Sequence, residues 1–306
     1  MKELVMVVGP PAAGKTTFSE RYVEDGFTYL SQDLLGNKPF SLFLQTIFSQ
    51  FIEKGENVVV ELPGFSKSQR SQCLDFAKDN GYKTTVIVLH QPYSVCLERC
   101  LSREGHPTNK DEKRARKTLD MFFAKYERVT NDEADTVIRK WPEGDKPKAV
   151  IVDLDGTLCN VEHRRHFVSG LNENKKDWDG FFGGIKNDTP NEWCVKLLRA
   201  MAIDHKIVYC SGRSDNLREA TMDWLIKYDL RPMNYKISEE SVKPDFHLYM
   251  RPYKDSRKDD VVKEIILDFE LLTRFTPLFM IDDRKQVVEM YRSRGFTCLQ
   301  CDEGNF

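Results

Sequence analysis

A glycine-containing loop near the N-terminus has the residue types that hold phosphate. Residues 9–17 read Gly-Pro-Pro-Ala-Ala-Gly-Lys-Thr-Thr and stand between an apolar strand predicted at 4–8 and a predicted helix. In a loop of this pattern, backbone N–H groups surround phosphate oxygens, the lysine reaches the β- and γ-phosphates, and the next hydroxyl binds Mg²⁺. The alternative is a chance turn rich in glycine and alanine. The predicted nucleotide site comprises Gly9, Ala12, Gly14, Lys15, Thr16 and Thr17.

Three more side chains could turn a nucleotide site into a phosphoryl-transfer site. Asp33 follows a strand predicted at 28–30, where its carboxylate could accept the proton of an attacking hydroxyl. Asp33 could equally cap a helix, since aspartate is a favoured N-cap residue. Arg99 and Arg103 are four residues apart, so a helix starting at 93 would place them on one face, where both could bind donor phosphates. They could instead form a solvated face with neighbouring glutamates.

A pair of aspartates in the second half of the chain has the spacing of a nucleophile and its acid/base partner. Asp153 and Asp155 close an apolar strand predicted at 149–154 and project the same way, and Gly156 permits a tight turn beyond them. One carboxylate can attack phosphorus, and the other can protonate the leaving oxygen and then activate water, while Mg²⁺ neutralises the clustered oxygens. The alternative is a simple turn after a strand.

Three later clusters could complete this second site. They are Ser211-Gly212-Arg213 after a strand predicted at 206–210, Lys263 in a predicted helix, and Asp282-Asp283 after a strand predicted at 278–281. The serine can donate to a phosphate oxygen, the lysine can balance the nucleophile and the phosphoryl group, and the aspartates can bind a magnesium ion. Taken singly, they could be a turn residue, a surface charge and a helix cap. Their order after successive strands favours one site, because active groups gather at the carboxyl ends of parallel strands.

The elements that must position these residues form two alternating series of strands and helices. In the first half, strands predicted at 57–60 and 84–89 flank a helix predicted at 69–78, the rhythm of a parallel sheet. A polar stretch with proline and glycine at 141–147 separates this series from the second. We therefore predict an α/β fold of two domains, 1–145 and 146–306, each a mainly parallel sheet flanked by helices. Residues 161–190 lack clear periodicity and are expected to form a small cap or insertion over the second site.

Length and composition agree with two globular domains and exclude several classes of protein. The 306 residues include 46 Lys and Arg against 48 Asp and Glu, which excludes the global cationic field of a histone-like protein. Hydrophobic residues at 40% and charged residues at 31% exclude wholesale disorder. No run approaches the roughly 20 apolar residues of a membrane span. The eight cysteines lack a disulfide spacing, and Cys298 and Cys301 form an isolated C-x-x-C, so reduced thiols in a cytosolic compartment are expected.

The motifs of the second half resemble those of the haloacid dehalogenase phosphatase superfamily, in the series D-L-D-G-T, S-G-R, a downstream lysine and I-D-D. With the phosphate-binding loop in front, nearly the whole chain resembles the bacteriophage-type polynucleotide 5′-kinase/3′-phosphatase family. The similarity continues through residues 257–263 and 281–290. The resemblance implies a P-loop kinase fold at 1–145, followed at 146–306 by a haloacid dehalogenase-like Rossmannoid fold with a small cap.

The resemblance also implies an activity: ATP-dependent phosphorylation of 5′-hydroxyl ends of RNA or DNA, and removal of 3′-phosphates through an aspartyl-phosphate, with ATP and Mg²⁺ as cofactors. It further implies cooperation with a nucleic-acid ligase, homo-oligomers and a cytoplasmic location, that of an infected host cell if a phage encodes the chain. The implied kinase roles are nucleotide binding by Lys15 and Thr16, proton removal by Asp33, and a grip on the donor phosphates by Arg99 and Arg103. The implied phosphatase roles are Asp153 as nucleophile, Asp155 as acid/base, Ser211, Gly212 and Arg213 on the substrate, Asp259 and Lys263 around the phosphoryl group, and Asp153, Asp155, Asp282 and Asp283 around the metal.

The sequence departs from this family pattern at two places in the kinase half. The family places an arginine for the acceptor phosphate shortly after its catalytic aspartate, but here Leu34-Leu35-Gly36 follows and Lys38 is the nearest base. The family also has an aspartate after the third strand, where this chain has Glu61. Two other functions remain open on the sequence: a small-molecule kinase fused to a small-molecule phosphatase, and a nucleotide-dependent binding protein with degenerate sites.

Overall fold

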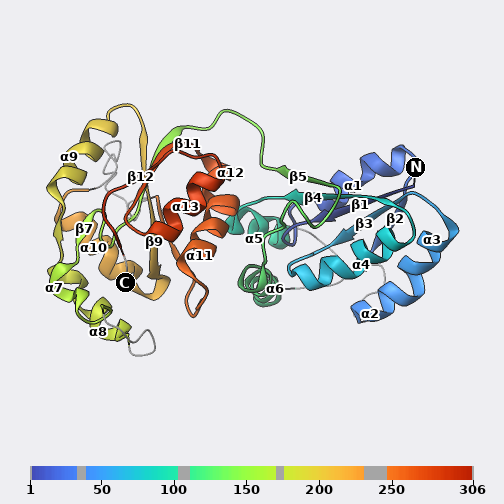
Figure 1. Ribbon diagram of the computed structural model, residues 1–306, viewed down its shortest axis with the longest axis horizontal. Helices are drawn as coiled ribbons and strands as arrows, with labels where there is room; N and C mark the ends of the chain where they lie inside the picture. The colour runs from blue at the N-terminus through green and yellow to red at the C-terminus, as the bar shows by residue number, and fades with distance from the viewer. Residues whose placement is uncertain (1, 33–38, 103–110, 170–175, 231–246, 305–306) are drawn as a thin grey trace. The chain divides into compact units, whose positions relative to one another are not determined.

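The computed structural model describes residues 2–32, 39–102, 111–169, 176–230 and 247–304 (Figure 1). The chain forms two compact units, Met1–Gly144 and Asp145–Phe306, each built on its own five-stranded sheet. Asp33 and Arg103, two of the predicted site residues, lie outside the described residues, as does Lys38.

The first unit is a parallel sheet with the strand order β2-β3-β1-β4-β5. Its strands are β1 (Glu3–Val8), β2 (Thr28–Ser31), β3 (Val58–Leu62), β4 (Lys83–Leu89) and β5 (Thr136–Lys140). Its helices are α1 (Lys15–Glu24), α2 (Phe40–Phe43), the π-helix η2 (Leu44–Phe48), α3 (Ser49–Lys54), α4 (Lys67–Asp79), α5 (Tyr93–Ser102) and α6 (Glu112–Lys125). The central strands β1 and β3 are nearly continuous apolar runs, as expected for strands covered on both faces.

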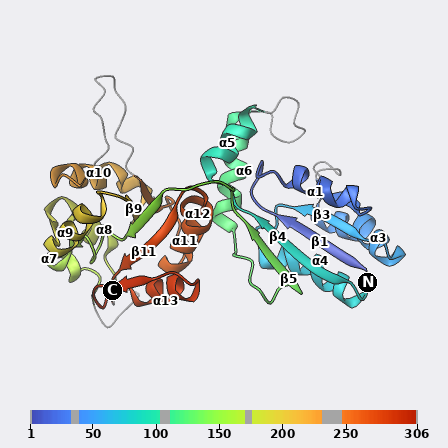
Figure 2. The ribbon, with the colours of Figure 1, turned by 90° about the horizontal axis from the view of Figure 1, so that it is seen from above.

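The two faces of this sheet bury alternate residues of β1. Leu4, Met6 and Val8 belong to one core, which contains side chains from α2, α3 and α4, whereas Val5 and Val7 belong to a second core beneath α1. Helices therefore cover both faces of the sheet (Figure 2). Because all five strands are parallel, the segments that come after them leave the sheet at the same edge, where the predicted nucleotide loop lies.

The second unit is a parallel sheet with the strand order β10-β9-β6-β11-β12, accompanied by a small antiparallel pair, β7 with β8. Its strands are β6 (Lys148–Val152), β7 (Cys159–Asn160), β8 (Thr189–Pro190), β9 (Lys206–Ser214), β10 (Leu248–Arg251), β11 (Thr276–Asp282) and β12 (Cys298–Gln300). Its helices are α7 (Glu162–Arg165), α8 (Trp178–Gly183), η4 (Ile185–Asn187), α9 (Glu192–Met201), η5 (Asp215–Leu217), α10 (Arg218–Lys227), α11 (Asp259–Ile266), the π-helix η6 (Leu267–Leu271), α12 (Leu272–Arg274) and α13 (Lys285–Ser293). Side chains of α9 and α10 pack on one face, and those of α11 and α13 on the other.

The predicted α/β architecture is confirmed, and two local differences have physical causes. Strand β9 continues to Ser214, so the Ser-Gly-Arg cluster lies within the strand rather than after it, because β10 pairs Met250 with Ser211 and Arg251 with Ser214. The sequence predicts a helix at 118–128, whereas α6 begins at Glu112, because the Asp111 carboxylate caps it by accepting the Arg114 N–H at 2.8 Å. The 161–190 segment contributes the short helices α7 and α8 and the strand β8. In the described ranges no helix is long and apolar enough to cross a membrane.

Candidate active sites

The phosphate-binding loop leaves β1 at Gly9 and enters α1 at Lys15. Gly14 has a φ of +94°, which favours glycine, and Gly9 lies so close to β4 that a Cβ there would stand 2.7 Å from the Leu89 carbonyl oxygen. The two glycines therefore allow the backbone to turn tightly just before a ten-residue helix. At the start of a helix, free N–H groups and the helix dipole favour an anion such as a phosphate.

Lys15 and Thr16 gather around one carboxylate at the end of β3. Lys15 Nζ donates to the Pro10 carbonyl at 3.1 Å and lies 4.0 Å from Glu61 Oε1. The Thr16 hydroxyl donates to Glu61 Oε2 at 2.9 Å, and the Tyr29 hydroxyl donates to the same oxygen at 2.6 Å. Burial and the hydrogen bond to Glu61 raise the pKa of Tyr29 to about 12, so the phenol keeps its proton at neutral pH. A threonine hydroxyl and a carboxylate are the oxygen ligands that suit Mg²⁺.

Helix α5 brings Arg99 to the nucleotide loop. Arg99 Nη1 donates to the Ala12 carbonyl at 3.4 Å, and Cys100 from the next position packs against Ala12. Thr17 lies in the first turn of α1, directly after Thr16. The structure therefore places Lys15, Thr16 and Arg99 around the predicted loop. Nucleotide binding by the loop residues stays a prediction, as do the roles of Asp33 and Arg103.

In the second unit, Lys263 joins the carboxylates at the ends of two neighbouring strands. Asp153 follows β6, Asp282 ends β11, and Lys263 reaches both from α11. Its Nζ lies 2.7 Å from Asp153 Oδ1, 2.8 Å from Asp282 Oδ2 and 3.5 Å from Asp259 Oδ2, and all four residues are buried. Burial lowers the pKa of a lysine, but these three carboxylates reverse the effect and raise the pKa of Lys263 well above its ordinary value. The lysine thus stays charged beside Asp153.

The second carboxylate of the I-D-D motif has the features of a metal ligand. Oxygens of Asp153, Asp282 and Asp283 lie within 4.8 Å of one another. Both Asp283 oxygens are buried and have no hydrogen-bond partner within the described part of the chain. Burial and the nearby Asp282 charge raise the pKa of Asp283 to about 7, because they outweigh the opposing charges of Lys263 and Arg284. A hard divalent cation such as Mg²⁺ would satisfy this cluster, so the residues fit the implied metal.

The backbone holds the Asp283 carboxylate in a cradle formed by two glycines. A Cβ at Gly156 would stand 2.3 Å from Asp283 Oδ2, and a Cβ at Gly304 would stand 2.0 Å from it. Gly304 N–H also donates to the Asp283 carbonyl at 3.0 Å. Any side chain at either position must therefore push the carboxylate away from its present place.

This cradle leads to a prediction for Gly304→Ala. The added methyl should displace the Asp283 carboxylate and weaken Mg²⁺ binding by roughly tenfold, the lower end of the range for disturbed metal surroundings. The measurement is the rise in melting temperature of the nucleotide-free protein as MgCl₂ is added, since a ligand that binds only the folded state stabilises it. Gly183→Ala is the matched control, because a Cβ at Gly183 meets nothing within 4 Å. An equal rise in melting temperature with MgCl₂ in both variants would contradict the proposed role of Asp283 as a Mg²⁺ ligand.

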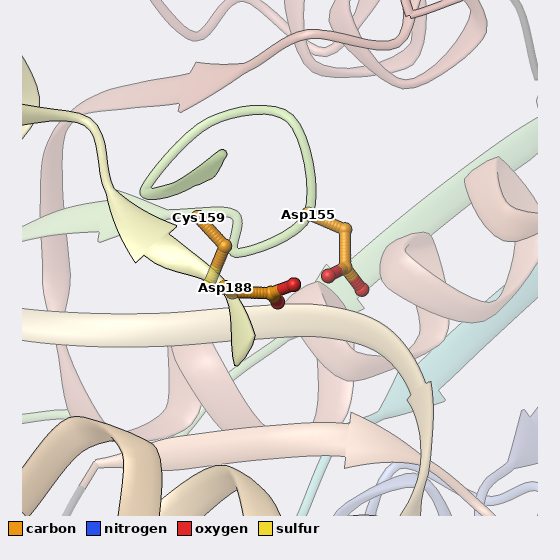
Figure 3. Close-up of side chains that lie close together, drawn as sticks. All are labelled: Asp155, Cys159 and Asp188. Atoms are coloured by element: carbon orange, nitrogen blue, oxygen red, sulfur yellow. The ribbon is translucent and has the colours of Figure 1, made fainter. Parts of the chain in front are cut away.

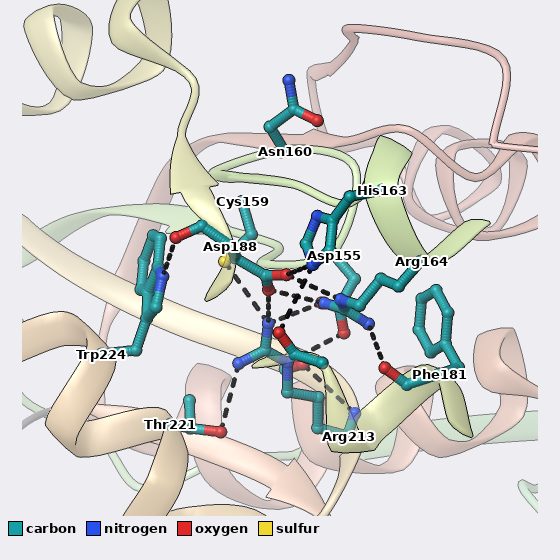
Figure 4. Close-up of polar contacts among 12 residues, drawn as sticks. Asp155, Cys159, Asn160, His163, Arg164, Phe181, Asp188, Arg213, Thr221 and Trp224 are labelled. Carbon is teal, nitrogen blue, oxygen red and sulfur yellow. Dashed lines mark hydrogen bonds and ion pairs between the residues drawn. The ribbon is translucent and has the colours of Figure 1, made fainter. Parts of the chain in front are cut away.

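Asp155 lies in a separate network of two carboxylates and two guanidinium groups (Figure 4). Arg213 donates to Asp155 through Nε at 2.9 Å and through Nη2 at 2.6 Å, and Arg164 Nη2 donates to the same carboxylate. Asp188 accepts from Arg164 Nε at 2.7 Å and Nη2 at 2.6 Å, and from Arg213 Nη2 at 3.2 Å. Each arginine therefore bridges both carboxylates. The Trp224 indole N–H, in turn, donates to the Asp188 carbonyl at 2.8 Å.

The same network explains why a second group of acidic and thiol side chains is no metal centre. Asp155, Cys159 and Asp188 lie close together (Figure 3). Their acceptor atoms are already bonded to cations, because Arg213 Nη2 also donates to Cys159 Sγ at 3.4 Å. Burial raises the pKa of the Cys159 thiol well above its ordinary value, so it stays protonated and binds metal poorly.

The two arginines set the protonation state of Asp155. Burial alone would raise the pKa of this carboxyl, but the charges and hydrogen bonds of Arg213 and Arg164 outweigh burial and lower it far below its usual range. Asp155 is therefore ionised in this structure, the form that accepts a proton. Its carboxylate stays outside the Asp153, Asp282 and Asp283 cluster. Metal binding by Asp155 therefore stays a prediction.

The Ser-Gly-Arg segment is held against α11. Ser211 is buried, and its Oγ accepts the Arg213 N–H at 3.2 Å. A Cβ at Gly212 would stand 2.3 Å from Asp259 Oδ1, so only glycine lets the strand pass this carboxylate. Arg251 secures the contact, because it donates to the Gly212 carbonyl at 2.9 Å and to Asp259 Oδ1 at 3.0 Å. Contacts of these residues with a substrate phosphate remain predictions.

Sequence reasoning missed Arg164, Asp188 and Tyr29. Arg164 stands in a run of charged residues within an aperiodic segment, and Asp188 precedes the two-residue strand β8. Neither belongs to a motif with fixed spacing. The sequence offered one usable signal. A buried carboxylate such as Asp155 requires a cationic partner, so an arginine or lysine was to be expected beside it.

Comparisons with known proteins match each half of the chain to a family model. Residues 147–306 match the family model described as the polynucleotide kinase PNKP phosphatase domain, and residues 4–129 match an AAA domain model. A putative bifunctional polynucleotide kinase/RNA ligase of Autographa californica nuclear polyhedrosis virus is 25% identical over 320 residues, covering 95% of this chain. The present chain spans 41% of the length of that relative.

Two solved structures illustrate the range of the structural matches. The Pnkp1/Rnl/Hen1 RNA repair complex contains a chain that is 22% identical, with coverage of 100% of this chain and 97% of that one and a TM-score of 0.41. A fungal RNA kinase is 16% identical over 45% of this chain and 38% of its own, with a TM-score of 0.36. The phosphatase-domain model covers residues 147–306, more than half of the 306, and the chain therefore belongs to the polynucleotide kinase PNKP phosphatase domain family.

Proposed function

We propose that this chain repairs nucleic-acid ends: it transfers the γ-phosphate of ATP to 5′-hydroxyl ends and removes phosphate from 3′ ends. The observation that carries the proposal is that a glycine loop with Lys15 and Thr16 follows a strand of one sheet, while the buried cluster of Asp153, Lys263, Asp282 and Asp283 lies at the strand ends of the other. Residues 1–145 are the proposed kinase domain, and residues 146–306 are the proposed phosphatase domain. A ligase would use the ends that these two reactions produce, a 5′-phosphate and a 3′-hydroxyl.

In the kinase reaction, the loop N–H groups and Lys15 hold the ATP phosphates, and Arg99 approaches from α5. Asp33 is the proposed base: it takes the proton of the 5′-hydroxyl as that oxygen bonds to the γ-phosphorus. The bond from the γ-phosphorus to its bridging oxygen breaks, and ADP leaves. Mg²⁺, when bound near Thr16, neutralises charge on the phosphates.

In the phosphatase reaction, an Asp153 oxygen bonds to the phosphorus of the 3′-phosphate, and the bond from phosphorus to the 3′-oxygen breaks. Burial raises the pKa of Asp153, and Lys263, 2.7 Å away, opposes this effect and favours the ionised form that attacks. The leaving 3′-oxygen takes its proton from Asp155. A water oxygen then bonds to the phosphorus of the aspartyl-phosphate as Asp155 takes the water proton, and the bond from phosphorus to Asp153 breaks and releases phosphate. Asp153, Asp282 and Asp283 would hold Mg²⁺, which neutralises the phosphate oxygens when bound. Asp155 is ionised in the absence of substrate. Its role as an acid therefore requires that substrate binding loosen an arginine contact, so that the carboxylate can take up a proton.

A paired assay tests this function. One arm measures transfer of label from γ-³²P-ATP to a 5′-hydroxyl oligonucleotide, and the other measures phosphate release from a 3′-phosphorylated oligonucleotide, each as RNA and as DNA. We expect turnover in both arms. Free nucleosides, sugars and their phosphates should react at least about a hundredfold more slowly, because only a polymer end also makes contacts away from the reacting group. Faster turnover of the small molecules would replace the proposal with a pair of small-molecule enzymes. No turnover in either arm would favour a binding protein with degenerate sites.

A further inference from the structure

Tyr29 lies in β2, one strand removed from the nucleotide loop. Strand β2 pairs with β3 in parallel register, with Tyr29 opposite Val59 and Ser31 opposite Glu61. The Tyr29 ring packs against the core beneath α1. This anchoring leaves only its hydroxyl to reach the carboxyl edge of the sheet, where it donates to Glu61 Oε2 at 2.6 Å.

Glu61 uses its two oxygens differently. Oε2 accepts both from Tyr29 and from the Thr16 hydroxyl, whereas Oε1 lies toward Lys15 at 4.0 Å. Glu61 is 7% exposed, so water contributes little to holding it in place. Two short donors on one oxygen therefore determine where the carboxylate sits.

The position of Glu61 determines the direction of the Thr16 hydroxyl. A threonine hydroxyl has one proton and two lone pairs, and the proton turns toward the available acceptor. With the proton donated to Glu61, the lone pairs face away from β3 and remain available to a cation. An outer partner that fixes a ligand in this way commonly changes metal affinity by roughly ten- to a hundredfold.

We propose that Tyr29 is a positioning residue of the nucleotide site, which acts through Glu61 to hold the Thr16 oxygen toward the divalent cation of the metal–ATP complex. The inference rests on the proposed function of the first unit as an ATP-dependent kinase, and adds a residue to it.

The test compares Tyr29→Phe with Tyr22→Phe. Tyr22 packs in the same core from α1, where its ring contacts Phe27, so it controls for loss of a phenol at this place. ATP binding is measured by calorimetry in MgCl₂ and again in EDTA. We expect Tyr29→Phe to weaken ATP binding roughly tenfold in MgCl₂ and to leave it unchanged in EDTA, because only the metal-dependent part passes through Thr16. Tyr22→Phe should match the wild type in both solutions.

A double variant checks that Tyr29 acts through Glu61. Glu61→Gln should weaken Mg²⁺-dependent ATP binding by itself, and adding Tyr29→Phe should weaken it little further, since the two changes remove one chain of contacts. Additive losses of ATP affinity in the double variant would overturn the inference. So would a loss of affinity by Tyr29→Phe that is as large in EDTA as in MgCl₂, because that result would indicate a merely structural role. Wild-type protein that binds ATP equally with MgCl₂ and EDTA, or not at all, would count against the proposed kinase site itself.

Discussion

Replacing Asp153 with asparagine should reduce release of 3′-phosphate by roughly a thousandfold or more, because an amide cannot attack phosphorus as a carboxylate does. The substitution keeps the volume of the side chain. It removes the negative charge of one partner of Lys263, which keeps the carboxylates of Asp282 at 2.8 Å and Asp259 at 3.5 Å, so the lysine remains paired. The measurement is phosphate release from a 3′-phosphorylated oligonucleotide with Mg²⁺ present.

Rapid acid quenching adds a direct view of the covalent step. With a 3′-³²P-labelled substrate, the wild-type protein should carry acid-stable label during turnover, and Asp153→Asn should carry none. Asp204→Asn serves as the control, since this exposed aspartate precedes β9. Wild-type-like phosphate release by Asp153→Asn would refute the covalent mechanism even if the unit proved to be a phosphatase. Kinase activity of the Asp153→Asn chain should be unchanged, because that site lies in the other unit.

The second large effect is expected for Lys15→Ala, which should lower transfer of phosphate to a 5′-hydroxyl end by at least about a hundredfold. Removing one charged donor aimed at a transferring group commonly costs this much. Lys15 is buried beside the loop and lies 4.0 Å from Glu61, and the variant leaves that glutamate with its Thr16 and Tyr29 donors. Lys125→Ala, at an exposed position of α6, controls for the loss of a lysine.

Release of 3′-phosphate by the same Lys15→Ala protein is the internal test of folding and of independence. It should stay within about twofold of the wild-type rate, because the proposed phosphatase residues all belong to the second unit. A Lys15→Ala chain that folds but loses both activities would contradict two independent sites.

Much of each site could be predicted because its residues stand at the ends of strands whose pattern is local. The apolar runs before Gly9 and Asp153 predict buried parallel strands, and the loops after parallel strands all emerge at one edge of a sheet. For that reason Asp153 and Asp282 were expected at one edge, whereas Lys263, from a helix far along the chain, was assigned to the nucleophile by its place in the motif series and lies beside both carboxylates. Strand periodicity and the carboxyl-edge rule were sufficient for the two carboxylates.

The partners that set the chemistry of these residues depended on packing between distant segments. Arg164 and Asp188 come from an aperiodic stretch, and only the folded chain shows that the two arginines, Arg164 and Arg213, keep Asp155 ionised. Gly304 reaches Asp283 because the segment after β12 returns to the sheet edge, a path that no local pattern encodes. These contacts arise from the close packing of a few short segments, so they become visible only when the backbone is in place. Residue types and spacing were thus enough to propose the reacting groups, whereas their protonation and orientation arise from tertiary neighbours, because burial and nearby charge control protonation and packing controls orientation.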